Sequence, residues 1–167
     1  MAEETIWRGH SSQLQNAGTF FLAGFITVVI IGFYFLATAA LLPVALAAFA
    51  PIILLVLVVP IFMALKSYLQ TNSRVYELTN ERIKTTRGVF SKVTDTLELY
   101  RVKDIETRQP FLYRMFGLEN VQLNTSDASS PFVLIDAVHS SAGLGDKIRN
   151  QVEVIRQQKR VRELDIE

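Results

Sequence analysis

Between Ser11 and Leu65 the sequence reads SSQLQNAGTFFLAGFITVVIIGFYFLATAALLPVALAAFAPIILLVLVVPIFMAL. This run contains no Asp, Glu, Lys or Arg. The hydrocarbon core of a bilayer is about 30 Å thick, and a helix needs about 20 residues to cross it. The run is therefore long enough for two membrane-spanning helices and much too long for one.

The break between the two helices is expected near residues 38–43. Pro43 lacks a backbone N–H, which suits the first position of a helix because that donor would have no partner there. The first span is therefore predicted at residues 18–41 and the second at residues 43–65. Together they predict a transmembrane helical hairpin.

Two other interpretations of the run are less favourable. A signal peptide has a basic start and an apolar core of about 7–15 residues, whereas this run is several times longer and follows Glu3 and Glu4. A helix of a soluble protein keeps a polar side, whereas residues 52–59 read IILLVLVV and are apolar on every face. Insertion into a membrane is therefore the prediction.

Flanking charges predict the orientation of the hairpin. Arg8 precedes the first span, many Lys and Arg residues follow the second, and the connecting turn has none. By the positive-inside rule, both termini are expected in the cytoplasm. Trp7 and Tyr68 lie at the polar boundaries, where interfacial rings are common. Because the spans contain no Asp, Glu, Lys, Arg or His, an anchor is favoured over a pore or a transporter.

From Lys66 onward the composition is that of a soluble domain, since all Lys and Arg residues except Arg8 lie there. Its segments alternate polar and apolar residues or are rich in β-branched residues, which favours strands. The turn residues Asn80 and Glu81 suit a tight hairpin, and residues 110–116 are expected as a short helix or turn. Strands are predicted at residues 75–79, 82–87, 92–99, 102–108, 121–125 and 132–135.

The last segment predicts an amphipathic helix capped by Ser140 or Ser141. Its apolar positions recur at helical spacing; they are Leu144, Ile148, Val152 and Ile155. Six or more strands followed by one helix predict a small antiparallel barrel or sandwich with the helix over one open end. Its core is expected to contain Tyr76, Leu78, Ile83, Leu97, Leu99, Ile105, Phe116, Val121 and Leu123. Gly88 and Gly117 are expected in backbone conformations that a Cβ would obstruct.

Three ordered segments resemble the bacterial pleckstrin-homology-like membrane protein family of the YdbS/YdbT type. They are WRGHSS at residues 7–12, YELTNERI at 76–83, and LYRVKDI at 99–105 running on to RMFGLENV at 114–121. Ser11 stands where the family has Pro. The resemblance implies a pleckstrin-homology-like (PH-like) barrel of about seven strands with a C-terminal helix, behind the hairpin. It also implies a bacterial cytoplasmic (inner) membrane protein and no established activity.

The expected organisation has three parts. Residues 1–17 form an N-terminal cytoplasmic segment, residues 18–69 form the transmembrane hairpin, and residues 70–167 form the PH-like domain.

The sequence contains no recognisable catalytic motif, neither a nucleophile elbow nor a phosphate-binding loop nor a zinc-binding His-Glu-x-x-His. His10 and His139 are far apart in sequence, and Asp104 and Glu106 fit a solvated strand face. With no cysteine and a net charge of +1, we predict no catalytic, cofactor or metal site and no nucleic-acid partner.

Two functions remain as hypotheses. The preferred one is a non-enzymatic interaction or scaffold module at the cytoplasmic face, which partners the bilayer and either itself, as a homo-oligomer, or another membrane protein. The alternative is binding or handling of anionic lipid, since basic residues near a membrane surface attract it by about 1 kcal/mol each. The candidate lipid contacts are Lys66, Arg74, Arg82, Lys84 and Arg87.

Overall fold

The computed structural model describes residues 3–40, 43–127 and 130–164. The chain divides into two compact units, and each is described by itself. One unit is the segment Asn16–Leu69. The other combines Met1–Gln15 with Gln70–Glu167, so segments from before and after the apolar helices belong to the same unit.

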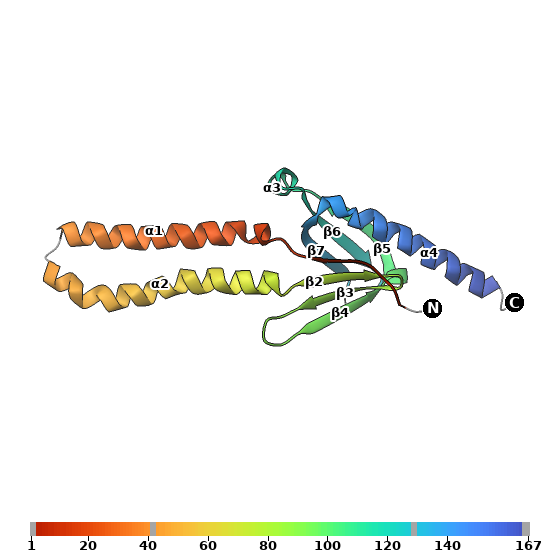
Figure 1. Ribbon diagram of the computed structural model, residues 1–167, viewed down its shortest axis with the longest axis horizontal. Coiled ribbons are helices and arrows are strands. Elements are labelled where there is room, and N and C mark those ends of the chain that lie inside the picture. Colours follow the sequence, from red (N-terminus) through yellow and green to blue (C-terminus); the bar gives the residue numbers. More distant parts are fainter. Residues whose placement is uncertain (1–2, 41–42, 128–129, 165–167) are drawn as a thin grey trace. The chain divides into compact units, whose positions relative to one another are not determined.

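The first unit is the predicted pair of apolar helices. Helix α1 covers Ala17–Ala40 and α2 covers Pro43–Asn72 (Figure 1). Both are long and apolar enough to cross a membrane, with mean hydropathies of 2.3 and 1.3 over their candidate spans. The residue before α1 is bonded to α2, since the Ser67 hydroxyl donates to Asn16 Oδ1 (2.8 Å) and Asn16 Nδ2 donates to the Ser67 carbonyl (3.2 Å). The centre of the predicted connecting turn, residues 41–42, lies outside the described residues.

The second unit contains two antiparallel sheets. The first has the order β1-β2-β3-β4, and its strands are Thr5–His10, Val75–Thr79, Arg82–Arg87 and Val93–Glu98. The second has the order β5-β6-β7, and its strands are Val102–Arg108, Leu118–Thr125 and Phe132–His139. A 3-10 turn at Leu99–Arg101 joins the sheets, and the short helix α3, Phe111–Met115, joins β5 to β6. The predicted strands are all present.

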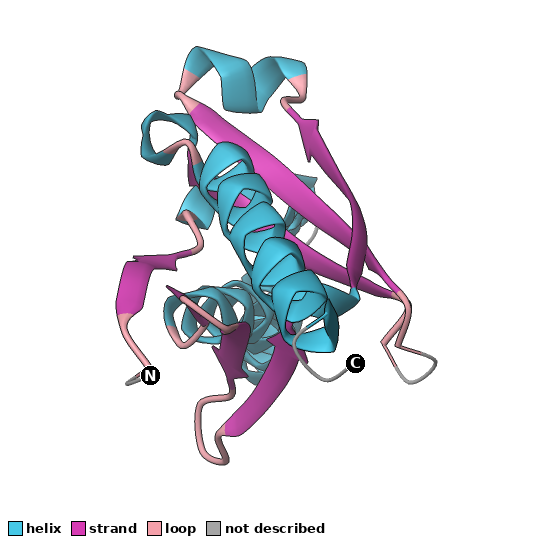
Figure 2. Ribbon diagram, turned by 90° about the vertical axis from the view of Figure 1, so that its right-hand side faces the viewer, coloured by secondary structure: helices cyan, strands magenta, loops and turns pink. Residues whose placement is uncertain are grey.

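The expected seven-stranded barrel is wrong in one respect, because the sheets do not close. Within the described residues no ladder connects the four-stranded sheet to the three-stranded one. Helix α4, Leu144–Leu164, lies in front of the two sheets in Figure 2 and supplies the missing cover. Leu144, Ile148 and Val152 of this helix are buried in the core, as the apolar spacing predicts.

The start of α4 differs from the prediction that Ser140 or Ser141 caps it. Both serines belong to a 3-10 turn, Ser140–Ala142, and Gly143 follows in the left-handed conformation. The backbone N–H and the hydroxyl of Ser140 instead donate to the Gly117 carbonyl, at 2.9 and 3.0 Å. This serine therefore ties the end of β7 to the start of β6, and α4 begins only at Leu144.

The core is mostly the predicted one. Seven of the nine expected residues are buried: Tyr76, Leu78, Ile83, Leu97, Leu99, Val121 and Leu123. Ile105 packs against them from a half-buried position. Phe116 is wrong, since it follows the short helix α3 and is 59% exposed.

Strand β1 is the main feature that sequence reasoning did not anticipate. It pairs antiparallel with β2, with His10 opposite Val75. The expected role of Trp7 as an interfacial ring is therefore wrong, because Trp7 lies in β1 and packs against the buried core. The apolar helices thus lie, in sequence, between two neighbouring strands of one sheet.

Gly88, in the loop that follows β3, provides a test of the backbone conformation of that loop. Its φ is +116°, outside the region that other residues tolerate, and a Cβ there would collide with the Ser91 carbonyl oxygen. We expect Gly88→Ala to lower the free energy of unfolding by about 1–3 kcal/mol, measured by thermal unfolding in nanodiscs with Trp7 fluorescence. The control is Gly117→Asn, at a φ of +63° that Asn tolerates. Equal stabilities of the Gly88 variant and the native chain would contradict the assigned loop conformation.

Candidate functional site

Among the residues that the structure describes, no side chains come together in an evident catalytic or metal site. No group of three or more His, Cys, Asp or Glu side chains arranged to hold a metal ion occurs in the part of the chain that the structure describes. His10 ends β1 and His139 ends β7, and both are exposed. The expected absence of an active site remains a prediction.

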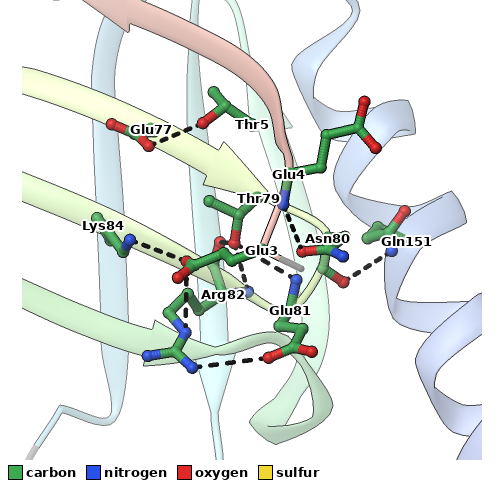
Figure 3. A network of polar contacts seen from close by, with 10 residues as sticks. All are labelled: Glu3, Glu4, Thr5, Glu77, Thr79, Asn80, Glu81, Arg82, Lys84 and Gln151. Atoms are coloured by element: carbon green, nitrogen blue, oxygen red, sulfur yellow. Dashed lines mark hydrogen bonds and ion pairs between the residues drawn. The ribbon is translucent and has the colours of Figure 1, made fainter. Parts of the chain in front are cut away.

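Two of the five candidate lipid contacts point at one carboxylate of the same domain. Lys84 Nζ lies 2.8 Å from Glu3 Oε1, and Arg82 Nε lies 3.5 Å from the same oxygen (Figure 3). Hydrogen bonding to Lys84 is the main cause that holds the pKa of Glu3 below its ordinary value. In this structure the two cations fasten the N-terminal segment rather than form an open basic patch.

The N-terminal segment is also held by Asn80, through its backbone and its side chain. The N–H of Asn80 donates to the Glu4 carbonyl (3.0 Å), and the N–H of Glu4 donates to Asn80 Oδ1 (3.2 Å; Figure 3). Gln151 of α4 donates to the Asn80 carbonyl (2.7 Å). The turn between β2 and β3 therefore joins the segment that precedes β1 to α4.

The other three candidates lie elsewhere. Arg74 NH1 lies 3.4 Å from Asp136 Oδ2, and Arg87 NH2 lies 3.0 Å from Asp95 Oδ2. Both cations are at the end of the four-stranded sheet opposite Arg82, since Val75 pairs with Thr86. Lys66 is exposed on α2, in the other unit.

The four candidate cations of this domain are thus not one cluster, and the exposed Arg87–Asp95 ion pair stabilises the fold by at most about 1 kcal/mol. Contact of the five candidates with lipid stays a prediction.

A shallow pocket lies between β5 and α4. Its volume is about 160 Å³, and it is lined by Val102, Lys103, Asp104, Ile105, Arg149, Val152, Glu153 and Arg156. Pockets that enclose small molecules usually measure about 300–1,000 Å³ and are mainly apolar. This pocket is smaller and carries charges of both signs, so it suits one or two side chains of a protein partner better than an enclosed metabolite.

Strand β5 and helix α4 are in contact at both ends of this pocket. Arg156 NH2 donates to the Val102 carbonyl at one end (2.7 Å). At the other end Gly145 approaches Thr107 so closely that a Cβ on Gly145 would lie 2.8 Å from Thr107 Oγ1. Sequence reasoning did not assemble this site, because its charged residues fall on a strand and a helix that are more than 40 residues apart, and each set alone fits a solvated face.

Two buried or half-buried carboxyls lie in the three-stranded sheet. Burial raises the pKa of Asp136 above its ordinary value, and the nearby Arg74 guanidinium offsets part of this rise. Burial also raises the pKa of Glu119, which is 6% exposed, and the negative charge of Asp146 adds to the effect. Gln109 Nε2 donates to Glu119 Oε2 at 3.3 Å and opposes it. Both carboxyls therefore hold a proton more tightly in the folded protein than in the unfolded chain.

The raised pKa of Glu119 predicts how the effect of Glu119→Gln on stability depends on pH. A carboxyl whose folded pKa is raised gives its full contribution to stability below its unfolded pKa and loses it as the pH rises through the folded pKa. We therefore expect the variant to raise the unfolding temperature relative to the native chain near neutral pH, and the difference to shrink towards pH 4.5, the ordinary value for Glu. The exposed control Glu153→Gln removes the same charge and should show no such trend. A difference for Glu119→Gln that grows on acidification would contradict the burial argument.

Comparison with known proteins identifies a family. The model of a family described as bacterial PH domain matches residues 17–152, which is more than half of the chain. The match begins with α1 and therefore leaves out β1. No curated protein and no solved structure matches the chain.

Proposed function

Because the chain belongs to the bacterial PH domain family, we propose that it is a membrane-anchored, non-enzymatic interaction module. In this proposal α1 and α2 cross the bacterial cytoplasmic membrane, and the PH-like domain binds a protein partner on the cytoplasmic side. The observation that carries the proposal is the insertion of two apolar helices between β1 and β2, whose residues His10 and Val75 are paired.

The exposure of the helices supports membrane insertion. Only 6% of the candidate span in α1 and 11% of that in α2 is buried within the protein. Core helices of a soluble protein would be mostly buried, whereas the large apolar side chains here, such as Phe21, Phe33 and Phe62, are exposed. Transfer of a fully exposed side chain of this size into an apolar surrounding is favourable by about 1.5–3 kcal/mol. A bilayer would provide that surrounding.

The sheet register supports a hairpin topology. Since β1 and β2 are hydrogen-bonded neighbours, the chain leaves the sheet at His10 and must return to the same sheet at Val75. Both ends of the inserted segment therefore lie on one side of any membrane that it crosses, which requires an even number of spans. The cations that follow α2 then favour the cytoplasmic side by the positive-inside rule.

The pocket between β5 and α4 is the proposed contact for a protein partner. Lys103, Asp104, Arg149 and Glu153 surround it with both signs of charge, which favours a partner with complementary charges over a plain anion. The partner is proposed to be a second copy of this chain or another membrane protein, because the anchor confines the domain to the membrane surface.

Site-specific photocrosslinking in native membranes tests this proposal. A photoreactive residue at Glu153, in the pocket, is expected to form a discrete adduct with a second copy or with one membrane protein. The matched control is Lys147, also exposed on α4 but outside the pocket. Adducts of equal yield at both positions, or none at Glu153, would reject the pocket as the binding site.

Anionic-lipid binding is the second candidate, favoured by the placement of Arg74 and Arg87 at the end of the sheet where the chain enters and leaves the helices. Native mass spectrometry of the protein from nanodiscs should then show retained phosphatidylglycerol. The variant Arg87→Glu should lose this lipid, whereas the variant Arg82→Glu should keep it. Retention that neither change affects would count against a basic lipid contact.

A further inference from the structure

Several large apolar side chains project from the PH-like domain into solvent. Phe90, in the loop between β3 and β4, is fully exposed, and its neighbour Val89 is 40% exposed. A second group surrounds α3, and its members are Phe111, Leu112, Met115 and Phe116, from 56% to 77% exposed. We call these six residues the apolar rim. Each of the two groups is a run of exposed apolar side chains close together in the sequence, and exposed apolar patches mark contact surfaces.

The β3–β4 loop lies at the end of the domain that is joined to the helices. Val75 pairs with both His10 and Thr86, so these three residues share one end of the four-stranded sheet. Strand β3 ends one residue later, at Arg87, and the loop follows directly. Val89 and Phe90 are therefore carried on the end of the sheet from which the chain departs at His10 and to which it returns at Val75.

Helix α3 belongs to the same end. Gly117, which follows α3, accepts hydrogen bonds from Ser140. Nearby in β7, the Ala137 carbonyl accepts from the N–H of Ser12 (2.9 Å), and Asp136 pairs with Arg74. Ser12 and Arg74 are the connections to α1 and α2. Within this domain, Figure 1 likewise shows α3 and the β3–β4 loop at one end, away from the chain termini.

Basic residues accompany both parts of the apolar rim. Arg87 and Lys92 border the β3–β4 loop, and Arg114 lies in α3. Arg87 forms an ion pair with Asp95. Lys92 and Arg114 are exposed and form no ion pair within the described residues. Apolar side chains beside basic ones are typical of segments that lie in the interface of an anionic membrane.

We propose that the apolar rim docks into the headgroup region of the membrane leaflet from which the helices emerge. This inference rests on the proposed anchoring of α1 and α2. The connections are short, with residues 11–16 before α1 and residues 73–74 after α2, so the anchor holds the rim near the leaflet at a high effective concentration. A contact too weak to hold a free domain then suffices. The PH-like domain is thereby held in one orientation, with the pocket between β5 and α4 left accessible.

Fluorescence quenching on the full chain tests this docking, because the sequence contains no cysteine. Variants with one cysteine each are made and labelled with a small fluorophore. The labelled positions at the rim are Ser91, beside Phe90, and Met115 in α3. Glu81, at the opposite end of β3, serves as the control within the domain, and Val28 in α1 as the control for the anchor. The protein is reconstituted in vesicles of phosphatidylcholine and phosphatidylglycerol that contain a lipid with a nitroxide near its headgroup, or along its acyl chain for Val28.

The proposal expects strong quenching at Ser91→Cys, Met115→Cys and Val28→Cys, and several-fold weaker quenching at Glu81→Cys. Adding Phe90→Glu and Leu112→Glu to the Ser91→Cys chain should reduce its quenching to the level of Glu81→Cys, whereas adding Ser130→Glu should leave it unchanged.

Two results would overturn the inference in different ways. Quenching at Val28 with none at Ser91 or Met115 leaves the anchor intact and shows that the rim is not docked, as when a protein covers it. An absence of quenching at Val28 as well rejects the anchor and, with it, the docking. Unchanged Trp7 fluorescence in each variant shows that the domain is folded.

Discussion

Replacing Tyr76 with Ala is expected to bring the PH-like domain close to unfolding. Tyr76 is fully buried in β2, and truncating a buried aromatic side chain costs about 3–5 kcal/mol. Its hydroxyl also accepts from the N–H of Asp136 (3.2 Å) and from the Ser11 hydroxyl (3.3 Å). Losing a partner for a buried donor adds about 1–3 kcal/mol. Domains of this size are stable by only about 5–15 kcal/mol.

Thermal unfolding of the full chain in nanodiscs measures this effect. The sequence has one tryptophan, Trp7, which packs against the core of the domain and therefore reports on the domain alone. A loss of 3 kcal/mol should lower the unfolding temperature by about 10 °C or more. Tyr76→Phe keeps the ring and removes only the hydroxyl, so it should lower the unfolding temperature by less than Tyr76→Ala does. The exposed Tyr100→Ala is the control, and a shift as large as that of Tyr76→Ala would contradict the assigned burial.

Much of the fold could be predicted because its signals are local. Strands β2, β3 and β5 begin and end where the alternating pattern and the turn residues place them. The apolar helices follow from an uncharged run that only two spans can use, and α2 begins at Pro43 as expected. The apolar spacing in the last segment identified the buried face of α4. In each case, neighbouring residues carry the whole signal.

The failures involve contacts between distant parts of the chain. Phe116 was expected in the core because it is apolar, but no local pattern tells a buried ring from one that a surface helix exposes. Ser140 resembles a helix cap, but it bonds to Gly117, more than 20 residues earlier. The sequence predicts Arg82 and Lys84 as lipid contacts, but in the fold both cations lie against the Glu3 carboxylate. The position of Glu3 depends on β1, whose partner follows the entire hairpin.

Because the apolar helices are inserted between β1 and β2, the chain connects the proposed anchor to the folded domain at two points. A domain that simply followed an anchor would have one connection to it and could rotate about that connection. Here the chain passes to the helices after His10 and returns before Val75, and the sheet pairs these two residues. The proposed docking of the apolar rim makes use of both connections, because they leave the domain at the same end of one sheet.

Removal of residues 2–10 is expected to abolish cooperative unfolding of the PH-like domain, although the family match begins only at residue 17. The deletion removes the whole of β1, the Trp7 ring that packs against the core, and the Glu4–Asn80 backbone contacts. Each net hydrogen bond contributes about 0.5–1.5 kcal/mol, and burial of a large apolar side chain contributes about 1.5–3 kcal/mol. The expected loss is therefore comparable to the total stability of such a domain.

Limited trypsin digestion in nanodiscs measures this loss without Trp7, since the Lys and Arg residues of the domain become accessible when it unfolds. We expect cleavage at many sites within the truncated domain under conditions in which the full chain resists. Trp7→Ala should give an intermediate rate, and Arg8→Ala, an exposed neighbour in β1, should match the full chain. If the truncated protein resisted as well as the full chain, the domain would be complete without β1. The two-connection tether would then have to be abandoned.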